Sequence, residues 1–307
     1  MAPIPARRAV RIEPPRGGCR QAARFPLAYT PDCYDRRRCV EGGAVSENNR
    51  APVGVDPFRP NPARVYNYML GGKDNYDADR EYGDRMLAVA PDTKVTAWHS
   101  RRFLLQAVRW AAQEGIRQFV DIGAGIPIEP NVHEVAQEID DTAIVASIDF
   151  DPVVHAHSNA LLTGATGVTP ILADIREPDK VLELARTDAG IDFSKPVAIL
   201  IVGVLHFVMD DEKPFEAVAR LREAMVPGSL LVIQHASTNT HPFFKNTSTT
   251  NAVDTPSQPA FRPPEEVRRF FEGLEMIDPG LAPANEWLEG NQQSTRLVVL
   301  CGIGRKN

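Results

Sequence analysis

The stretch Gln118–Asn131 decides the fold, and it reads Gln-Phe-Val-Asp-Ile-Gly-Ala-Gly-Ile-Pro-Ile-Glu-Pro-Asn. An apolar β-type run, from Phe119 to Ile122, is followed by two glycines one residue apart, Gly123 and Gly125, and then by a predicted helix. Glycine lets the backbone turn sharply and approach a ligand at a point where a Cβ atom would collide. The pattern is typical of the first strand of a doubly wound α/β sheet as it enters a nucleotide site.

The dinucleotide fingerprint Gly-x-Gly-x-x-Gly requires a third glycine at position 128, but that position holds Ile128. The third glycine allows a helix and a strand to pack closely beside a pyrophosphate. Its absence argues against a dinucleotide. A ligand without phosphates fits the stretch better.

Two further β-type runs end in aspartate at the same predicted edge as Asp121, namely Ala143–Asp149 and Val168–Asp174. An acid after the second strand can accept hydrogen bonds from two ribose hydroxyls, and Asp174 can accept one from an adenine amino group. A single aspartate after a strand is most often a turn or N-cap residue. Three of them at one edge, beside the glycine pair, predict a site for an adenosine-containing ligand.

This arrangement resembles the S-adenosylmethionine-dependent methyltransferases of Rossmann-like fold, whose first motif reads apolar-Asp-x-Gly-x-Gly. The chain is most similar to a high-GC bacterial branch of undefined substrate, and the Gly-Gly-Lys-Asp-Asn block is the most specific part of the likeness, which covers roughly Asp56 to Arg305. The matching blocks are Arg64–Tyr76, Arg117–Pro127, Asn131–Val135, Asp149–Val153 and Val204–Val208. The resemblance implies an α/β fold with a doubly wound, mostly parallel seven-stranded sheet of class I methyltransferase type and an N-terminal helical cap. It also implies S-adenosyl-L-methionine as the cofactor.

The residues expected to bind this cofactor lie along the sheet edge and in the cap. In the cap, Tyr66, Lys73 or Asn75 would reach the methionine carboxylate, which needs a cation or a hydroxyl donor. Solvated polar residues on a lid are the alternative interpretation of this block. Asn131 is predicted to cap the helix that follows the glycine loop. Backbone N–H groups near Gly125 can donate hydrogen bonds to the same carboxylate. The predicted set is Asp121, Gly123, Gly125, Asp149, Phe150, Asp174, Ile175, Val202, Tyr66, Lys73 and Asn75.

His206 is the candidate general base. It follows the predicted fourth strand, Val197–Val202, and in the fold that the chain resembles these residues line the gap between the methyl group and the acceptor. Histidine titrates near neutrality, which suits a proton acceptor. A packing or hydrogen-bonding role is equally open for His206. His235, after the fifth predicted strand, is a second candidate, whereas His133 is expected to be solvated or to lie behind the ligand-contacting residues.

A small molecule is the expected methyl acceptor. The Asn/Asp-Pro-Pro-Tyr block with which nucleic-acid methyltransferases bind an exocyclic amine is absent after Val202, where Gly-Val-Leu-His206 follows. A formal net charge of −6 also disfavours a general nucleic-acid binder. Two other functions stay open: a non-catalytic sensor or interaction protein that binds S-adenosylmethionine and, less favoured, an NAD(P)-dependent oxidoreductase.

Composition divides the 307 residues into three parts. Residues 1–50 hold ten arginines, no lysine and five acids, so we predict a disordered extension there. Residues 56–116 form the predicted helical cap, and residues 117–307 the predicted methyltransferase core. One hypothesis is that translation starts downstream, for instance at Val45.

Periodicity predicts the remaining elements. Cap helices are expected from Pro62, over Asp79–Val89 and over Trp98–Glu114; in the third, Arg101 and Arg102 face outward or toward the ligand. We predict a long loop over Thr238–Pro259 beside the active edge. After it come a helix from Pro263, a short strand near Met276, a loop with Trp287 and a last strand over Arg296–Gly302 that closes the sheet as a hairpin.

Neither a membrane span nor a metal site is predicted. The longest apolar run, Val197–Met209, is interrupted by His206 and is far shorter than the roughly 20 residues that a membrane span needs. Met1–Ala28 lacks the apolar segment of a secretory signal, so a cytoplasmic location is predicted. The four cysteines, Cys19, Cys33, Cys39 and Cys301, match no zinc spacing and are expected to be free thiols. The oligomeric state cannot be predicted.

Overall fold

The computed structural model describes residues 55–241, 259–288 and 292–307, which belong to one compact unit, Val45–Asn307. The predicted disordered extension, the hypothetical start at Val45 and most of the predicted loop Thr238–Pro259 lie outside the described residues, as do Cys19, Cys33 and Cys39.

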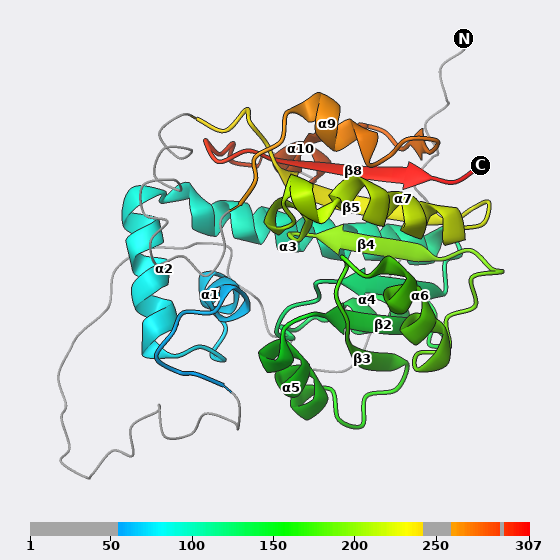
Figure 1. The fold of residues 1–307 in the computed structure, drawn as a ribbon, viewed down its shortest axis with the longest axis horizontal. Helices are drawn as coiled ribbons and strands as arrows, with labels where there is room; N and C mark the ends of the chain where they lie inside the picture. The colour runs from blue at the N-terminus through cyan, green and yellow to red at the C-terminus, as the bar shows by residue number, and fades with distance from the viewer. Residues whose placement is uncertain (1–54, 242–258, 289–291) are drawn as a thin grey trace, which may run out of the picture. The chain divides into compact units, whose positions relative to one another are not determined.

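The fold is α/β, with a central, mostly parallel sheet in the order β3-β2-β1-β4-β5-β8-β6 and with β7 paired to β8 (Figure 1). The parallel strands are β1 (Gln118–Ile122), β2 (Ile144–Asp149), β3 (Val168–Leu172), β4 (Ala198–Val202) and β5 (Leu230–Ala236). The antiparallel strands are β6 (Glu275–Met276), β7 (Ala282–Pro283) and β8 (Val299–Arg305). The order reverses direction between β1 and β4, where an α/β sheet forms its ligand crevice.

The sheet has eight strands and not the predicted seven. Both β6 and β7 are only two residues long, and each pairs with a different part of β8. A two-residue pairing leaves no alternation of apolar and polar residues in the sequence. The strand near Met276 was predicted nevertheless, but β7 was not. The last strand also lies further along the chain than predicted, because β8 runs from Val299 to Arg305.

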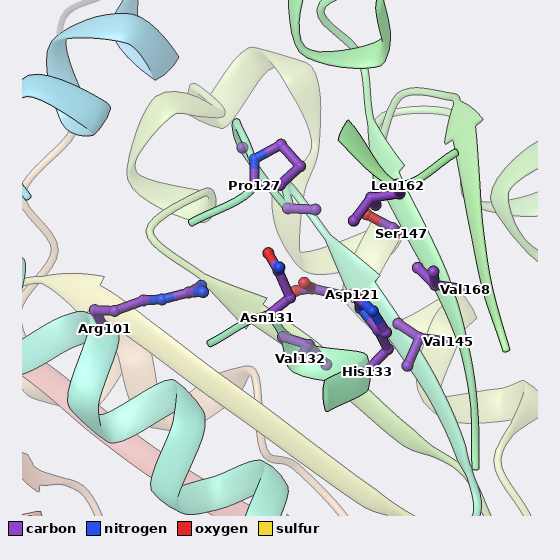
Figure 2. Close-up of a pocket in the computed structure, with 12 residues that line it drawn as sticks. Arg101, Asp121, Pro127, Asn131, Val132, His133, Val145, Ser147, Leu162 and Val168 are labelled. Carbon is purple, nitrogen blue, oxygen red and sulfur yellow. The ribbon is translucent and has the colours of Figure 1, made fainter. Parts of the chain in front are cut away.

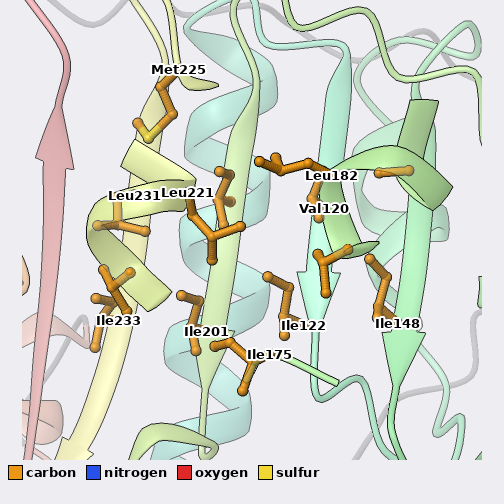
Figure 3. Close-up of a cluster of buried hydrophobic side chains, with 14 of the residues drawn as sticks. Val120, Ile122, Ile148, Ile175, Leu182, Ile201, Leu221, Met225, Leu231 and Ile233 are labelled. Carbon is orange, nitrogen blue, oxygen red and sulfur yellow. The ribbon is translucent and has the colours of Figure 1, made fainter. Parts of the chain in front are cut away.

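Helices cover both faces of the sheet (Figure 1). On one face, α6, α7 and α9 cover an apolar cluster that includes Val120, Ile148, Ile201 and Ile233 (Figure 3). On the other face, α3, α4 and α10 cover a second cluster that includes Phe119, Val145, Leu200 and Val232. The bounds are α3 (Asp92–Gln113), α4 (Val132–Gln137), α5 (Pro152–Leu161), α6 (Pro178–Thr187), α7 (Pro214–Ala224), α9 (Pro264–Arg269) and α10 (Ala284–Trp287), with 3-10 turns η2 (Leu205–Phe207) and η3 (Asp210–Glu212). Trp287 therefore ends a short helix and does not lie in a loop.

Two helices, α1 (Pro62–Met69) and α2 (Asp77–Val89), precede α3 and stand apart from the sheet faces (Figure 1). Asn61 caps α1 through Oδ1, and Gly71, with φ at 80°, follows its C-terminus. Although α3 starts before the predicted Trp98, its predicted apolar stripe is buried: Phe103, Leu104, Ala107, Val108 and Ala111. Since α3 packs along the sheet, the cap and core boundaries at residues 56–116 and 117–307 stay a prediction.

Cys301 is a buried free cysteine in β8, and burial raises the pKa of its thiol. Among residues 55–241, 259–288 and 292–307, no helix combines the length and the apolar character needed to cross a membrane.

Candidate functional site

The carboxyl ends of β1 and β2 are joined by hydrogen bonds that bring Asp121 and Asp149 to one edge. Asp121 lies opposite Ser147 in the register of the two strands. The backbone N–H groups of Gly123 and Ala124 donate to the carbonyl oxygen of Ile148 at 2.7 and 3.0 Å. The N–H of Gly125 then donates to Oδ2 of Asp149 at 2.9 Å. The glycine loop and the second aspartate thus form one structural unit.

The two glycines serve different purposes, although both have positive φ, at 75° and 68°. A Cβ atom on Gly123 would lie 2.1 Å from Cγ2 of Val204, so this glycine allows the loop after β4 to approach β1. A Cβ atom on Gly125 would meet no heavy atom within 4 Å. Gly125 therefore faces open space, as a residue that a ligand approaches should.

A pocket opens beside this loop, between α3, α4 and the end of β2 (Figure 2). Figure 2 shows Arg101 extending from α3 toward Asn131 and Asp121, which come from the opposite side. Asn131 caps α4 in a reciprocal arrangement with Glu134, as predicted for an N-cap. The pocket is lined by Arg101, Asp121, Ala124, Gly125, Pro127, Asn131, Val132, His133, Val145, Ser147, Leu162 and Val168.

Arg101 supplies the positive charge of the pocket. Its Nη2 atom donates to the carbonyl oxygens of Ile128 at 2.6 Å and Pro130 at 2.7 Å, which fixes the path of the loop between β1 and α4. Both hydrogen bonds of Arg101 come from Nη2. Its Nε and Nη1 atoms have no acceptor among the described residues. Burial lowers the pKa of Arg101, while Tyr66, Asp121 and Glu134 act to raise it.

Asp121 supplies the negative charge. Burial raises the pKa of its carboxyl group to about 7; Arg101 opposes this rise and Asp149 adds to it. The carboxylate has no hydrogen-bond partner in the described part of the chain and is only 5% exposed. Burial also raises the pKa of Asp149, despite hydrogen bonds from the N–H groups of Asp151 and Gly125. Both acids would be stabilised by a ligand that donates hydrogen bonds or carries positive charge.

Ile128, where the dinucleotide fingerprint requires glycine, anchors the N-terminal helices to the glycine loop. It packs against a small cluster formed by Val65, Met69, Leu70 and Ala97 from α1 and α3. Glycine at this position would remove that contact. In a dinucleotide site, a glycine here would allow close packing beside a pyrophosphate. In this protein, the isoleucine side chain instead contacts the N-terminal helices.

The three predicted ligands from the N-terminal helices differ in their surroundings. Tyr66 donates from Oη to the carbonyl oxygen of Ala97 at 3.3 Å, and although 38% of the residue is exposed, burial of the hydroxyl raises its pKa to about 12. The charge of Arg101 acts to lower this pKa, so the hydroxyl lies within electrostatic range of a residue that lines the pocket. Asn75 is engaged at both ends of its amide, with Asn67 and Gly72 on one side and Arg80 on the other. Lys73 is exposed.

The loop of Gly71–Asn75 nevertheless lies against the core near the end of β2. Oδ1 of Asp74 is 4.0 Å from Nδ1 of His157 on α5. Nδ2 of Asn61 donates to Oδ2 of Asp151, the N-cap residue of α5. These contacts bring the N-terminal helices beside Asp149, but the roles of Lys73 and Asn75 as ligands stay predictions.

Asp174 lies two residues beyond β3 and is held by Arg176. Nε of Arg176 donates to both carboxylate oxygens at 2.9 Å. Burial acts to raise the pKa of Asp174, but the hydrogen bonds from Arg176 prevail and hold it below its ordinary value. The same guanidinium stacks over the ring of Phe150 at 5.6 Å, and that ring is 61% exposed. An exposed aromatic ring beside the end of β2 suits a flat base, with Ile175 buried next to Asp174.

His206 lies in η2, directly after β4 and the turn at Gly203, which has φ at 81°. Its Nδ1 atom is buried and lacks a partner in the described chain. Burial, helped by His235 and Arg262, lowers the pKa of His206 to about 3. The ring is therefore neutral at neutral pH and can accept a proton, but it is a weak base in this state. Val202, just before it, is partly buried.

His235 has a structural position. It is fully buried, its Nδ1 lies 2.8 Å from the carbonyl oxygen of Ala236, and its Nε2 lies 2.7 Å from Nη1 of Arg262. Because guanidinium is only a donor, Nε2 accepts and Nδ1 carries the hydrogen. Burial lowers the pKa of His235 to about 4. With both ring nitrogens engaged, His235 has no free nitrogen for an acceptor.

Arg262 is the buried residue that sequence reasoning missed. It is 2% exposed and donates to the carbonyl oxygens of Leu205 and Val208, at 3.0 and 2.8 Å, and to Oδ1 of Asp210 at 2.7 Å. It thereby fixes the loop that carries His206. Its only sequence signal was an arginine before two prolines, which does not reveal burial. Arg101 was noticed, but not its contacts with the glycine loop.

The fold defines a class of protein, a Rossmann-like α/β protein, and its pocket lies beside the glycine loop after β1. A family model described as S-adenosyl methyltransferase matches residues 48–307. A solved methyltransferase candidate from Thermobifida fusca YX is 34% identical, with 81% of this chain and 96% of that chain covered and a TM-score of 0.74. A DUF574 family protein from Streptomyces avermitilis MA-4680 is 31% identical, with 81% and 98% covered and a TM-score of 0.75. No match was found among curated proteins.

The chain belongs to the S-adenosyl methyltransferase family. It is an S-adenosylmethionine-dependent methyltransferase, as the sequence predicted, and nothing favours the oxidoreductase or the sensor. The pocket suits this cofactor on structural grounds. Gly125 faces open space, the buried Asp121 carboxylate has no hydrogen-bond partner among the described residues, and Arg101 offers a cation nearby. An α-amino acid group carries one charge of each sign and would satisfy both side chains.

Proposed function

We propose that the enzyme transfers a methyl group from S-adenosylmethionine to a small-molecule acceptor. The observation that carries the proposal is that Arg101 and the buried carboxylate of Asp121, which accepts no hydrogen bond from the described residues, line one pocket beside Gly125. When bound, S-adenosylmethionine supplies a methyl group attached to a positively charged sulfur. The rest of the cofactor is the leaving group and becomes a neutral thioether. Such a reaction needs little covalent help, and positioning of the acceptor can supply much of the acceleration.

In this proposal, each of the site residues binds a different part of the cofactor. Arg101 binds the methionine carboxylate and Asp121 the ammonium group, with Tyr66 beside Arg101. Gly123 and Gly125 form the cradle, and Asp149 accepts hydrogen bonds from the ribose hydroxyls. The adenine lies against Phe150, near Asp174 and Ile175, and Val202 borders the methyl group. Lys73 and Asn75 stay candidates on the Gly71–Asn75 loop, whose motif we take to mark the family branch.

His206 is proposed to accept a proton when the acceptor is a hydroxyl or an acidic carbon. A thiolate or a neutral amine needs no base. The absence of an Asn/Asp-Pro-Pro-Tyr block after Val202 and the net charge of −6 support a small molecule over a nucleic acid.

The test is incubation with methyl-labelled S-adenosylmethionine and a host extract separated into small molecules, nucleic acid and protein. Label in a small molecule, identified by mass spectrometry, is the expected result. Label confined to nucleic acid or protein contradicts the proposal. A variant with Asp121 replaced by asparagine controls for transfer by other enzymes in the extract.

A further inference from the structure

Gln234, near the carboxyl end of β5, is a polar residue that follows four apolar residues of the strand, Leu230 to Ile233. Leu230 and Val232 belong to the cluster beneath α3, whereas Leu231 and Ile233 belong to the cluster on the opposite face. Successive side chains of a strand point to opposite faces, so the side chain of Gln234 lies on the same face as Leu230 and Val232, the face that α3 covers. It is only 2% exposed.

The amide oxygen of Gln234 is buried and has no hydrogen-bond partner among the residues that the structure describes. It lies beside the turn after β4, because a Cβ atom on Gly203 would be 3.8 Å from it. A buried amide oxygen without a partner is unfavourable, and most such groups in proteins are satisfied. A partner from outside the chain would remove this cost.

Gln234 lies on the far side of β4 from Asp121 and Asp149, the proposed cofactor residues of β1 and β2. Asp121 on β1 pairs with Leu200 on β4, and Val202 on β4 pairs with Gln234 on β5. Two strand spacings, about 10 Å, therefore separate β1 from β5 across the sheet. A ligand held on β1 and β2 leaves the position over β4 and β5 to a second reactant.

We propose that Gln234 is a specificity-determining residue of the acceptor site, where its Oε1 accepts a hydrogen bond from an N–H or O–H group of the methyl acceptor. The inference rests on the proposed small-molecule function and narrows it to acceptors with such a donor near the methylated atom. Val202 and Val204 border the same turn and are apolar, so a single polar contact there would fix the orientation of the acceptor.

The test compares Gln234→Met with Gln118→Met, a matched control at the amino end of β1. Gln118 is 8% exposed, but both ends of its amide are used: Oε1 accepts from the N–H of Asp192 at 2.7 Å, and Nε2 donates to its carbonyl oxygen at 3.1 Å. The measurements are the melting temperature, the affinity for S-adenosylhomocysteine by calorimetry, and label transfer from methyl-labelled S-adenosylmethionine to small molecules of a host extract.

For Gln234→Met we expect an unchanged or higher melting temperature, affinity within about 2-fold of wild type, and transfer that falls about 10-fold to 100-fold. For Gln118→Met we expect the opposite, a lower melting temperature with transfer retained while the protein is folded. A purely structural role for Gln234 would make the two variants alike. Retained transfer in Gln234→Glu, with loss in Gln234→Met, would support a cationic N–H donor.

Three results overturn the assignment. They are a melting temperature that falls in Gln234→Met as in Gln118→Met, transfer that stays at the wild-type rate, and a loss of S-adenosylhomocysteine binding in parallel with transfer. A wild-type enzyme that labels no small molecule overturns the proposed function together with this assignment, so the two failures are distinguishable.

Discussion

The backbone N–H of Gly125 donates a hydrogen bond of 2.9 Å to Oδ2 of Asp149. This bond joins the glycine loop after β1 to the end of β2, and it fixes their relative geometry before any ligand binds. Oδ1 of the same carboxylate accepts from the N–H of Asp151 at 3.0 Å. Each oxygen keeps a further lone pair, so the carboxylate is oriented and still able to accept two hydroxyls.

Replacing Asp149 by alanine should therefore abolish tight cofactor binding. Two ribose hydrogen bonds to a charged acceptor are worth about 2–3 kcal/mol or more, which corresponds to an affinity lower by about 30-fold or more. Calorimetry with S-adenosylhomocysteine measures the change. Wild-type affinity in this variant would rule out the proposed position of the ribose.

Replacing Arg101 by methionine should weaken S-adenosylhomocysteine binding by about 10-fold to 100-fold, because the carboxylate loses its cation and the loop carbonyl groups of Ile128 and Pro130 lose their donor. Arg101→Lys should recover part of the affinity, since lysine keeps the charge but not the fork of donors. Arg102→Met is the control, because Arg102 bonds to Gln292 instead. Equal affinities in the Arg101 and Arg102 variants would remove Arg101 from the site.

Asp121 should make the stability of the free enzyme depend on pH. Burial raises its pKa from 3.8 to about 7, so between these values the folded protein binds a proton that the unfolded chain has released. Its contribution to stability therefore falls as the pH rises through this window, and at pH 8 the ionised carboxylate costs up to about 4 kcal/mol.

Asp121→Asn should accordingly melt at a higher temperature than the wild type at pH 8 but not at pH 4, and it should lose S-adenosylhomocysteine binding. Thermal denaturation at the two pH values measures this. Asp141→Asn, at an exposed position, serves as the control. An identical change in melting temperature at both pH values would contradict the burial of a charged carboxyl group.

Local pattern explains how much of this fold and site was predictable. The five parallel strands and the cap at Asn131 follow from apolar runs and polar stops that lie next to one another in sequence. The positions of the glycine pair and Asp149 at the ends of β1 and β2 were predictable for the same reason, because a strand, a turn and an acid are local signals.

Contacts between distant segments were not predictable. Arg262 binds Leu205 and Val208, more than fifty residues away, and nothing near it in sequence distinguishes it from an exposed arginine. One local contact was not predictable either: Arg176 binds Asp174 from two residues away, and an aspartate after a strand does not by itself indicate such a pairing. His235 looked like a candidate base until its two nitrogens were seen to be engaged by Ala236 and Arg262.

Ile128 should stabilise the packing of the N-terminal helices on the glycine loop. Ile128→Ala removes its contact with the cluster of Val65, Met69, Leu70 and Ala97, and we expect a loss of about 1–3 kcal/mol in the free energy of unfolding. Ile139→Ala, at a residue that is 38% exposed, should cost less. Urea denaturation measures both. Ile128→Gly should not create affinity for NAD, and such affinity would show that the isoleucine alone excludes a dinucleotide.

Arg262 should hold the loop after β4 in its working position. Arg262→Met leaves the carbonyl oxygens of Leu205 and Val208 without their donor, so we expect a loss of about 2–4 kcal/mol in the free energy of unfolding. Since Arg262 also acts to lower the pKa of His206 and of His235, both values should rise, which histidine titration by NMR can follow.

Arg269→Met is the matched control for this change. Both arginines stack on Phe215, at 5.6 Å for Arg262 and 4.2 Å for Arg269, but the Arg269 side chain is 55% exposed. The Arg269 variant should therefore lose less than about 1 kcal/mol and leave both histidines unchanged. S-adenosylhomocysteine should bind both variants with wild-type affinity, because β1 and β2 do not depend on this contact. An Arg262 variant as stable as the Arg269 variant would show that the loop holds its position without the buried guanidinium.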